Sequence, residues 1–295
     1  MVEAFRSLPR AFGPHMKYSN VVAAGALCVL LATSCATPQR IANLPKERFT
    51  LPNGSEFVKL EPLPFDMGSD VLRGGYVRVK LTPFYIQSTE VTNAQFEKVM
   101  GRRKRHPVSD ADNEPVSGLS IKDIKEYIRR LSKESGKTFR LPSSAEYEYA
   151  ARGGYERMNY PWGPEVVSIE KRAQTSLMTR KEGTVPVKSF PPNYFGLYDL
   201  VGNVQEVVLD TASHVLMPER EKILNDPQFV DSRKEDIDVY AQGGAFGDIF
   251  PFLWVMFPTI LSDDLESRGF NGDVGFRLVI SSAKLRRIEI PTEYL

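Results

Sequence analysis

Sulfur and imidazole are scarce in this sequence, and their scarcity excludes several kinds of site. The two cysteines are Cys28 and Cys35, so no disulfide framework, cysteine zinc cluster or cysteine nucleophile can exist further along the chain. A three-histidine metal site would need all three histidines, including His15 in the presequence, together with His106 and His214. We therefore set aside thiolate and three-histidine metal sites.

A charge imbalance and a long hydrophobic run are also missing. The 38 basic and 37 acidic residues are scattered along the chain and leave a net charge of +1. Such a balance gives no general attraction to DNA, RNA or anionic lipid, and we expect no nucleic-acid partner. With 42% hydrophobic and 25% charged residues the chain is not a disordered one.

The start of the chain has the pattern of an export signal. Lys17 is followed by the uncharged run 21–32, VVAAGALCVLLA, which is long enough for a signal-peptide core but too short to span a bilayer as a helix. Small residues at 32–34 then lead to Cys35, and the segment resembles a bacterial lipoprotein signal with Leu31 one place further upstream than usual. The resemblance implies lipidation of Cys35, a membrane partner through that lipid, and a periplasmic or cell-surface location. An ordinary cleaved signal or an uncleaved anchor is the alternative, and both also place the domain outside the cytoplasm.

These features divide the chain into four parts. We predict a signal peptide over 1–35, in which Met16 is a better start than Met1 and 1–15 is a gene-model extension. Residues 36–56 are expected to be a linker and the edge of the domain, 57–282 the domain itself, and 283–295 an exposed tail.

Short helices with marked starts are expected within a loop-rich domain. Thr92, Ser120 and Ser143 are each followed three residues later by Gln95, Asp123 and Glu146, which is the spacing of a capping box or of an acidic first turn. Glycines follow the predicted helices. Alternating apolar residues predict strands at 77–81 and 276–280.

A family resemblance rests on several strings that occur in order along the chain. They are PNGSEFVKL, FYIQSTEVTNAQF, GKTFRLPSSAEYEYAARGG, YPWG, VPVKSFPPNYFGLYDLVGNVQEV, QGGAF and VGFRLV. Together they resemble the sulfatase-modifying-factor, or formylglycine-generating-enzyme, domain over about 57–280. The resemblance implies a single α+β domain of the irregular, loop-rich, C-type-lectin-like kind.

The same resemblance argues against that family's oxidase chemistry. The family binds copper through two cysteine thiolates five residues apart, and the matching positions here are Asp248 and Leu253. A carboxylate and an alkyl group cannot form a bis-thiolate Cu(I) site, so we expect no copper and no formylglycine-generating activity. The iron-dependent sulfoxide synthases of the superfamily use histidines and a helical domain that this chain lacks.

One segment resembles the loop that wraps calcium in the family. Carried over residue by residue, Asp199 and Glu206 would offer carboxylates, and Gly202 and Val204 would offer backbone carbonyls. Hard oxygen ligands suit Ca²⁺. The alternative is that the two carboxylates only hold the loop by hydrogen bonds, since Gln205 and Val207 replace the family's flanking tryptophans.

The stretch after the Gly-Gly motif is unexpectedly apolar. It reads FGDIFPFLWVMFPTIL over 246–261. One interpretation is that a former catalytic groove has filled with core residues; the other is an exposed ligand-binding face, because large apolar patches mark interaction sites. The predicted face comprises Phe246, Asp248, Phe250, Phe252, Trp254 and Phe257, with a polar rim of Asp263, Asp264, Glu266 and Arg268.

Three functions follow from these patterns. The first is a lipid-anchored protein that binds an unknown protein or surface ligand, similar to variable proteins of diversity-generating retroelements, whose diversified residues precede the closing Gly275-Phe276-Arg277. The second is an enzyme of unrecognised activity that uses Asp248 with Arg268 or Glu266. The third is an accessory lipoprotein of an envelope or motility assembly.

Overall fold

The computed structural model describes most of the chain after the predicted signal. The described residues are 44–69, 75–162, 171–175, 183–212, 223–231, 239–248, 255, 259–261 and 272–290. They belong to one compact unit, Pro38–Leu295. The predicted lipidation site Cys35 lies outside them. In this part of the chain no helix is long and apolar enough to cross a membrane.

Three helices begin where their caps were predicted. They are α4 (Asn93–Met100), α5 (Ile121–Ser135) and α6 (Ser144–Ala151). Each has a complete capping box, in which Thr92, Ser120 and Ser143 accept a backbone N–H and the third helical residue reaches back. Gly101 and Gly136 end the first two helices, as the sequence indicated.

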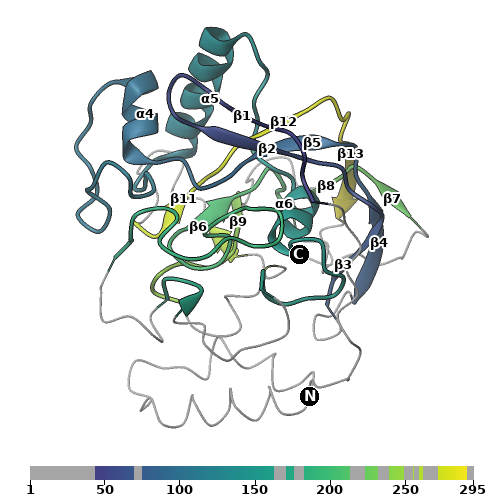
Figure 1. Ribbon diagram of the computed structural model, residues 1–295. Helices are drawn as coiled ribbons and strands as arrows, with labels where there is room; N and C mark the ends of the chain where they lie inside the picture. The colour runs from purple at the N-terminus through teal and green to yellow at the C-terminus, as the bar shows by residue number, and fades with distance from the viewer. Residues whose placement is uncertain are drawn as a thin grey trace. The chain divides into compact units, whose positions relative to one another are not determined.

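Among the described residues, short strands form four small sheets (Figure 1). One has the order β1 (Arg48–Thr50), β2 (Glu56–Leu60), β5 (Phe84–Gln87), β12 (Val279–Ser281). A second has the order β10 (Thr259–Leu261), β9 (Val239–Gln242), β6 (Gln205–Val207), β11 (Val274–Gly275). The others are β3 (Phe65–Gly68), β4 (Tyr76–Lys80), β7 (Leu224–Asn225), and β13 (Arg286–Ile290) paired with β8 (Pro227–Asp231).

Two predictions about the ends of the domain need correction. The expected tail 283–295 contains β13, which pairs in parallel with β8 while Ile288 packs against the core. The predicted strand at 276–280 begins only at Val279, as β12. Phe276 and Leu278 are buried, as their apolar character suggested, but they lie in irregular chain before β12. Within the segment 36–56, predicted to be a linker and the domain edge, β1 pairs with β2 at the sheet edge.

The core consists of two apolar clusters around the helices. One surrounds α6, all eight residues of which are buried, and the other lies under α4 and α5. In α5 the buried residues are Ile121, Ile124, Tyr127 and Leu131, which lie on one face of the helix. Few short helices, small sheets and much irregular chain make this an α+β domain of the C-type-lectin-like kind, as predicted.

Candidate functional site

A buried ion pair lies at the centre of the predicted calcium loop. Arg277 donates from Nε to Glu206 Oε2 at 2.6 Å and from Nη2 to Glu206 Oε1 at 2.7 Å, and both side chains are fully buried. The same guanidinium donates to the carbonyls of Tyr198 and Gln87. A bidentate pair that also binds two carbonyls fixes the positions of three separate segments.

Two further carboxylates lie close to this pair. Glu90 Oε1 accepts a hydrogen bond from Asn203 Nδ2 at 3.1 Å, and Asp199 Oδ2 accepts one from the Lys188 N–H at 2.8 Å. The other oxygen of each, Glu90 Oε2 and Asp199 Oδ1, is buried without a hydrogen-bond partner. The buried group therefore carries three carboxyls against the single guanidinium of Arg277.

Burial governs the protonation of these acids. It raises the pKa of Glu90 well above its ordinary value, with the nearby carboxyls of Asp199 and Glu206 acting in the same direction. It also raises the pKa of Glu206, which Arg277 opposes, and raises the pKa of Asp199 to about 6. The cluster therefore holds protons more firmly than exposed carboxyls do, because a second and third buried negative charge are costly.

The donor set can be compared with the needs of a calcium ion. Among the described residues, no group of three or more His, Cys, Asp or Glu side chains is arranged to hold a metal. The predicted set has two carboxylates and two backbone carbonyls, however, and the buried Asp199 Oδ1 has no hydrogen-bond partner. Hard oxygens with an excess of buried negative charge fit Ca²⁺. Asp199, with the carbonyls of Gly202 and Val204, would hold the ion, whereas both oxygens of the predicted ligand Glu206 already accept hydrogen bonds from Arg277.

Close backbone packing keeps this loop in place. Gly202 has φ +76, and a Cβ there would come within 2.3 Å of the Gln174 carbonyl oxygen. Gly243 has φ +92, and a Cβ there would come within 2.4 Å of the Tyr147 hydroxyl. Tyr147 donates its hydroxyl to the Leu200 carbonyl at 3.0 Å. Glycine is required at both positions for space as well as for conformation.

The segment that follows Gly243-Gly244 begins beside the loop. The Phe246 N–H donates to the Asn203 carbonyl, and Asp248 Oδ2 accepts from the Ala245 N–H at 2.8 Å. Burial raises the pKa of Asp248, and the carboxyl of Asp273 adds to that effect. Asp248 is thus partly buried and close to a second carboxyl.

The structure tests only part of the predicted ligand-binding face. Phe246 and Asp248 are described and partly exposed. The other predicted face residues, Phe250, Phe252, Trp254, Phe257, Asp263, Asp264, Glu266 and Arg268, lie outside the described residues. Within the same apolar stretch Val255 is buried and donates its N–H to the Asn159 carbonyl, and Leu261 is buried in β10. At these two positions the stretch contributes to the core.

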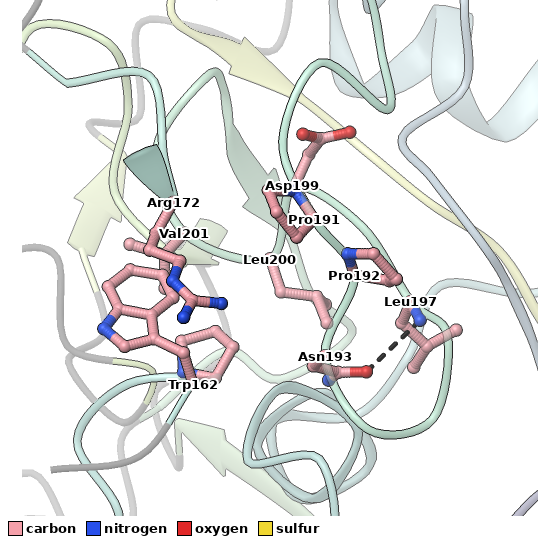
Figure 2. A pocket seen from close by; sticks show the side chains of 10 residues that line it. Trp162, Arg172, Pro191, Pro192, Asn193, Leu197, Asp199, Leu200 and Val201 are labelled. Carbon is pink, nitrogen blue, oxygen red and sulfur yellow. Dashed lines mark hydrogen bonds between the residues drawn. The ribbon is translucent and has the colours of Figure 1, made fainter. Parts of the chain in front are cut away.

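A small hollow borders the predicted calcium loop. Its volume is about 310 Å³ including the open mouth, and its lining includes Trp162, Arg172, Pro191, Pro192 and Leu200. Figure 2 shows the Trp162 ring and the Arg172 guanidinium side by side on one wall. Asp199 also borders the hollow but directs its carboxylate away from the space between these side chains (Figure 2).

Sequence reasoning missed two members of the buried cluster. Arg277 was recognised in the closing Gly-Phe-Arg motif without its partner Glu206, which lies 71 residues earlier. Glu90 was not singled out at all. Nothing in the string STEVT distinguishes Glu90 from an exposed acid, and an isolated acid is normally an exposed one. Two other arginines also fix the chain: Arg140 donates to the Leu141 carbonyl and pairs with Glu146, and Arg152 donates to the Asp66 carbonyl of β3 and pairs with Glu148.

Comparison with known families decides the membership of this chain. Residues 42–282 match the family described as "Sulfatase-modifying factor enzyme 1-like domain". The chain belongs to this family. The match includes the calcium-loop segment, the Gly-Gly motif and the closing Gly-Phe-Arg, so the buried cluster lies within the family's domain.

Individual members of the sulfatase-modifying factor family include active and inactive proteins. The chain is 26% identical to the mouse formylglycine-generating enzyme over 272 residues, which covers 63% of this chain and 71% of the enzyme. It is 38% identical over 104 residues to a bovine protein named inactive C-alpha-formylglycine-generating enzyme 2, covering 31% of each. Family membership therefore does not establish catalysis.

A solved structure shows how far the fold is shared. Treponema denticola variable protein 1 superposes with a TM-score of 0.67 at 20% sequence identity, covering 79% of this chain and 98% of that one. At this identity the likeness establishes the shared fold. It extends the sulfatase-modifying-factor scaffold to a protein named for its variability.

Proposed function

We propose that this chain is a lipid-anchored, extracytoplasmic binding protein on the formylglycine-generating-enzyme scaffold, without cysteine–copper oxidase activity. One observation carries the proposal: the chain has no cysteine after Cys35. A soft thiolate pair is what holds Cu(I), and Asp248 stands where the first of the family's thiolates is expected. The existence of a family member named as inactive supports a non-catalytic use of the scaffold.

The proposed ligand is a protein or another surface molecule, bound between Phe246 and Arg268. The likeness to a variable protein supports a scaffold whose irregular segments can change while the core stays. Under this proposal the residues before Gly275-Phe276-Arg277 are diversified by a retroelement. A reverse-transcriptase gene nearby and an adenine-biased near-copy of this stretch are the expected findings. If the gene's neighbourhood contains neither feature, the diversification hypothesis is contradicted, whereas the proposal of ligand binding is unaffected.

A pull-down with the purified chain tests ligand binding. Trp254→Ala with Phe257→Ala should abolish capture of the ligand, because large aromatic side chains dominate interface energies. The matched control is Leu63→Ala with Ile223→Ala, since both of these apolar side chains are 48% exposed and lie elsewhere. Equal capture by both double variants would contradict the proposed face.

The lipid anchor has a direct test of its own. Intact-mass analysis of the chain extracted from membranes should show cleavage before Cys35 and an added diacylglyceryl group. Cys35→Ser should lose the added mass and leave the membrane fraction. An unmodified Cys35 in membrane-extracted protein would overturn the anchor while leaving the ligand face untouched.

Calcium binding at the buried loop is part of the same proposal. The support is the excess of buried carboxyls and the unpartnered Asp199 Oδ1. Calorimetry should show one calcium bound per chain, with affinity falling below about pH 6 as Asp199 takes up a proton. Asp199→Ala should remove binding, whereas Asp110→Ala, at an exposed acid elsewhere, should leave it unchanged.

One observation favours an enzymatic alternative at the same place. Asp248 is partly buried, has a raised pKa and lies near Asp273, and such carboxyl pairs occur in acid–base catalysis. Metal analysis of the purified chain and an oxygen-uptake assay with a cysteine peptide distinguish the two functions. Activity that Asp248→Asn abolishes would establish the enzyme.

A further inference from the structure

The solvent side of α5 carries a row of like charges. Lys122, Lys125, Arg129 and Lys133 are all exposed and follow one another at intervals of three, four and four residues. This spacing places them on one face of the helix, opposite the buried Ile124, Tyr127 and Leu131. Like charges at such spacing destabilise a helix, so the row is not explained by the needs of α5 itself.

The acids of the helix do not cancel the row. Asp123, Glu126 and Glu134 lie along one flank, where Glu126 accepts hydrogen bonds from Arg129 and Arg130. Within the described part of the chain, Lys122, Lys125 and Lys133 form no ion pair. Three of the four cations in the row are thus available to an external anion.

More cations lie at both ends of α5. Arg103 donates to the carbonyls of Ser117 and Gly118, which places its neighbours Arg102 and Lys104 at the start of the helix. Both neighbours are exposed and without an ion pair among the described residues.

At the far end, Lys137 Nζ lies 5.2 Å above the Phe49 ring of β1. The chain enters β1 through the exposed Lys46. We define the basic face as Arg102, Lys104, Lys122, Lys125, Arg129, Lys133 and Lys46. The net charge of +1 for the whole chain conceals this local concentration.

The length of chain between Cys35 and β1 indicates what the basic face contacts. Twelve residues, 36–47, lie between Cys35 and Arg48, the first residue of β1, and this connection reaches at most about 45 Å when fully extended. Because Lys137, just past the end of α5, lies over the Phe49 ring of β1, a lipid on Cys35 would keep the Lys133 end of the basic face within about that distance of the bilayer, with the Lys122 end about 20 Å further along the helix. We propose that the basic face lies against anionic phospholipid headgroups of the membrane that holds the anchor, an inference that rests on the lipid anchor proposed above.

Charge complementarity supports this occupant. Lysine ammonium and arginine guanidinium groups donate hydrogen bonds to phosphate oxygens, and each basic residue near an anionic bilayer strengthens association about fivefold. The attraction acts within a distance of about 8–10 Å at physiological salt, which the tether makes accessible. The face would orient the domain rather than hold it alone.

Amine labelling of the full chain, purified from membranes and reconstituted, tests the proposal. Vesicles of phosphatidylcholine are compared with vesicles that also contain phosphatidylglycerol, at low and high salt, and labelling is read by mass spectrometry. Lys122, Lys125 and Lys133 should be labelled severalfold less on the anionic vesicles at low salt. The exposed Lys80, Lys171 and Lys284 should be labelled equally on both. Equal labelling of all six lysines would overturn the proposal.

Matched charge reversals separate the face from net charge. Lys122→Glu with Lys125→Glu and Lys133→Glu should abolish the protection of Lys46 and Lys104. Reversal at Lys80, Lys171 and Lys284 changes the net charge equally and should preserve that protection; loss in both variants would overturn the proposal.

The intact mass of the same sample reports the anchor separately. An acylated chain whose lysines are not protected would support the lipid anchor and contradict the headgroup contact of the basic face. Protected lysines on an unacylated chain would support the headgroup contact and contradict the lipid anchor. Protection by soluble polyphosphate but not by vesicles would show that the membrane is the wrong occupant.

Discussion

The loop around Glu206 and the stretch after Gly243-Gly244 are neighbours that differ in kind. In the loop, the guanidinium of Arg277 binds both oxygens of the buried Glu206 and two backbone carbonyls. In the following stretch Asp248 stands where the family's chemistry needs a thiolate, and apolar residues follow it. The comparison teaches that the groups which hold the scaffold together are present while the groups for oxidation are absent. A scaffold can keep its fold without one particular set of chemical groups, because stability and chemistry depend on different residues.

The largest effect should come from removing the buried ion pair between Arg277 and Glu206. Arg277→Met would leave Glu206 buried without its counter-charge and should lower the free energy of unfolding by about 3–5 kcal/mol. Denaturant unfolding measures the loss. The control is Arg129→Met, whose exposed side chain pairs with the half-buried Glu126 at the surface, and it should change little. If the purified Arg277→Met chain does not fold, Arg277→Lys should give a smaller loss; a loss equal to that of the control would contradict the account.

Two glycines give a sharper comparison with a smaller expected effect: Gly243 packs against the loop, and Gly247 lies in the stretch that follows. Gly243→Ala would force φ +92 on an alanine and bring its Cβ against Tyr147, so unfolding should become easier by about 1–3 kcal/mol. Gly247, four residues on, has no atom within 4 Å of an added Cβ. Gly247→Ala should therefore stay within about 0.5 kcal/mol of the parent. Similar losses at the two glycines would show that both regions are equally constrained.

A graded dependence of stability on pH is expected in the presence of a calcium chelator. The pKa of Asp199 is raised to about 6 and that of Asp210 to about 7, in both cases mainly by burial. The folded protein then binds these protons more tightly than the unfolded chain, so the free energy of unfolding should fall as pH rises from about 4 to about 7. Asp210→Asn should flatten the upper part of that profile, and added calcium should flatten the part due to Asp199. A profile that rises over this range would contradict the burial of both acids.

Local features of the fold were predictable because their causes are close in sequence. A capping residue and its partner are three positions apart, and so Thr92, Ser120 and Ser143 identified the helix starts. The strand β13 was missed because its partner β8 lies about sixty residues earlier, and a strand with charged residues such as Arg286 and Glu289 resembles a solvated tail.

The candidate site was predictable only in its motif residues. Asp199 and Glu206 follow from the resemblance to a calcium loop, whereas their neighbour Glu90 is more than a hundred residues away and carries no local signal. The pairing of Arg277 with Glu206 requires the parallel contact of β11 with β6, which no local pattern encodes. Sequence thus identified which residues matter, and the tertiary structure determined which of them meet.

The most direct test of the central claim is a copper titration combined with product analysis. The purified chain is titrated with Cu(I) and then incubated with oxygen and a sulfatase-type cysteine peptide, whose mass is read. The account predicts no stoichiometric Cu(I) uptake and no conversion of the cysteine to formylglycine, because the folded domain contains no thiolate. Uptake of one Cu(I) per chain together with a formylglycine product would contradict it.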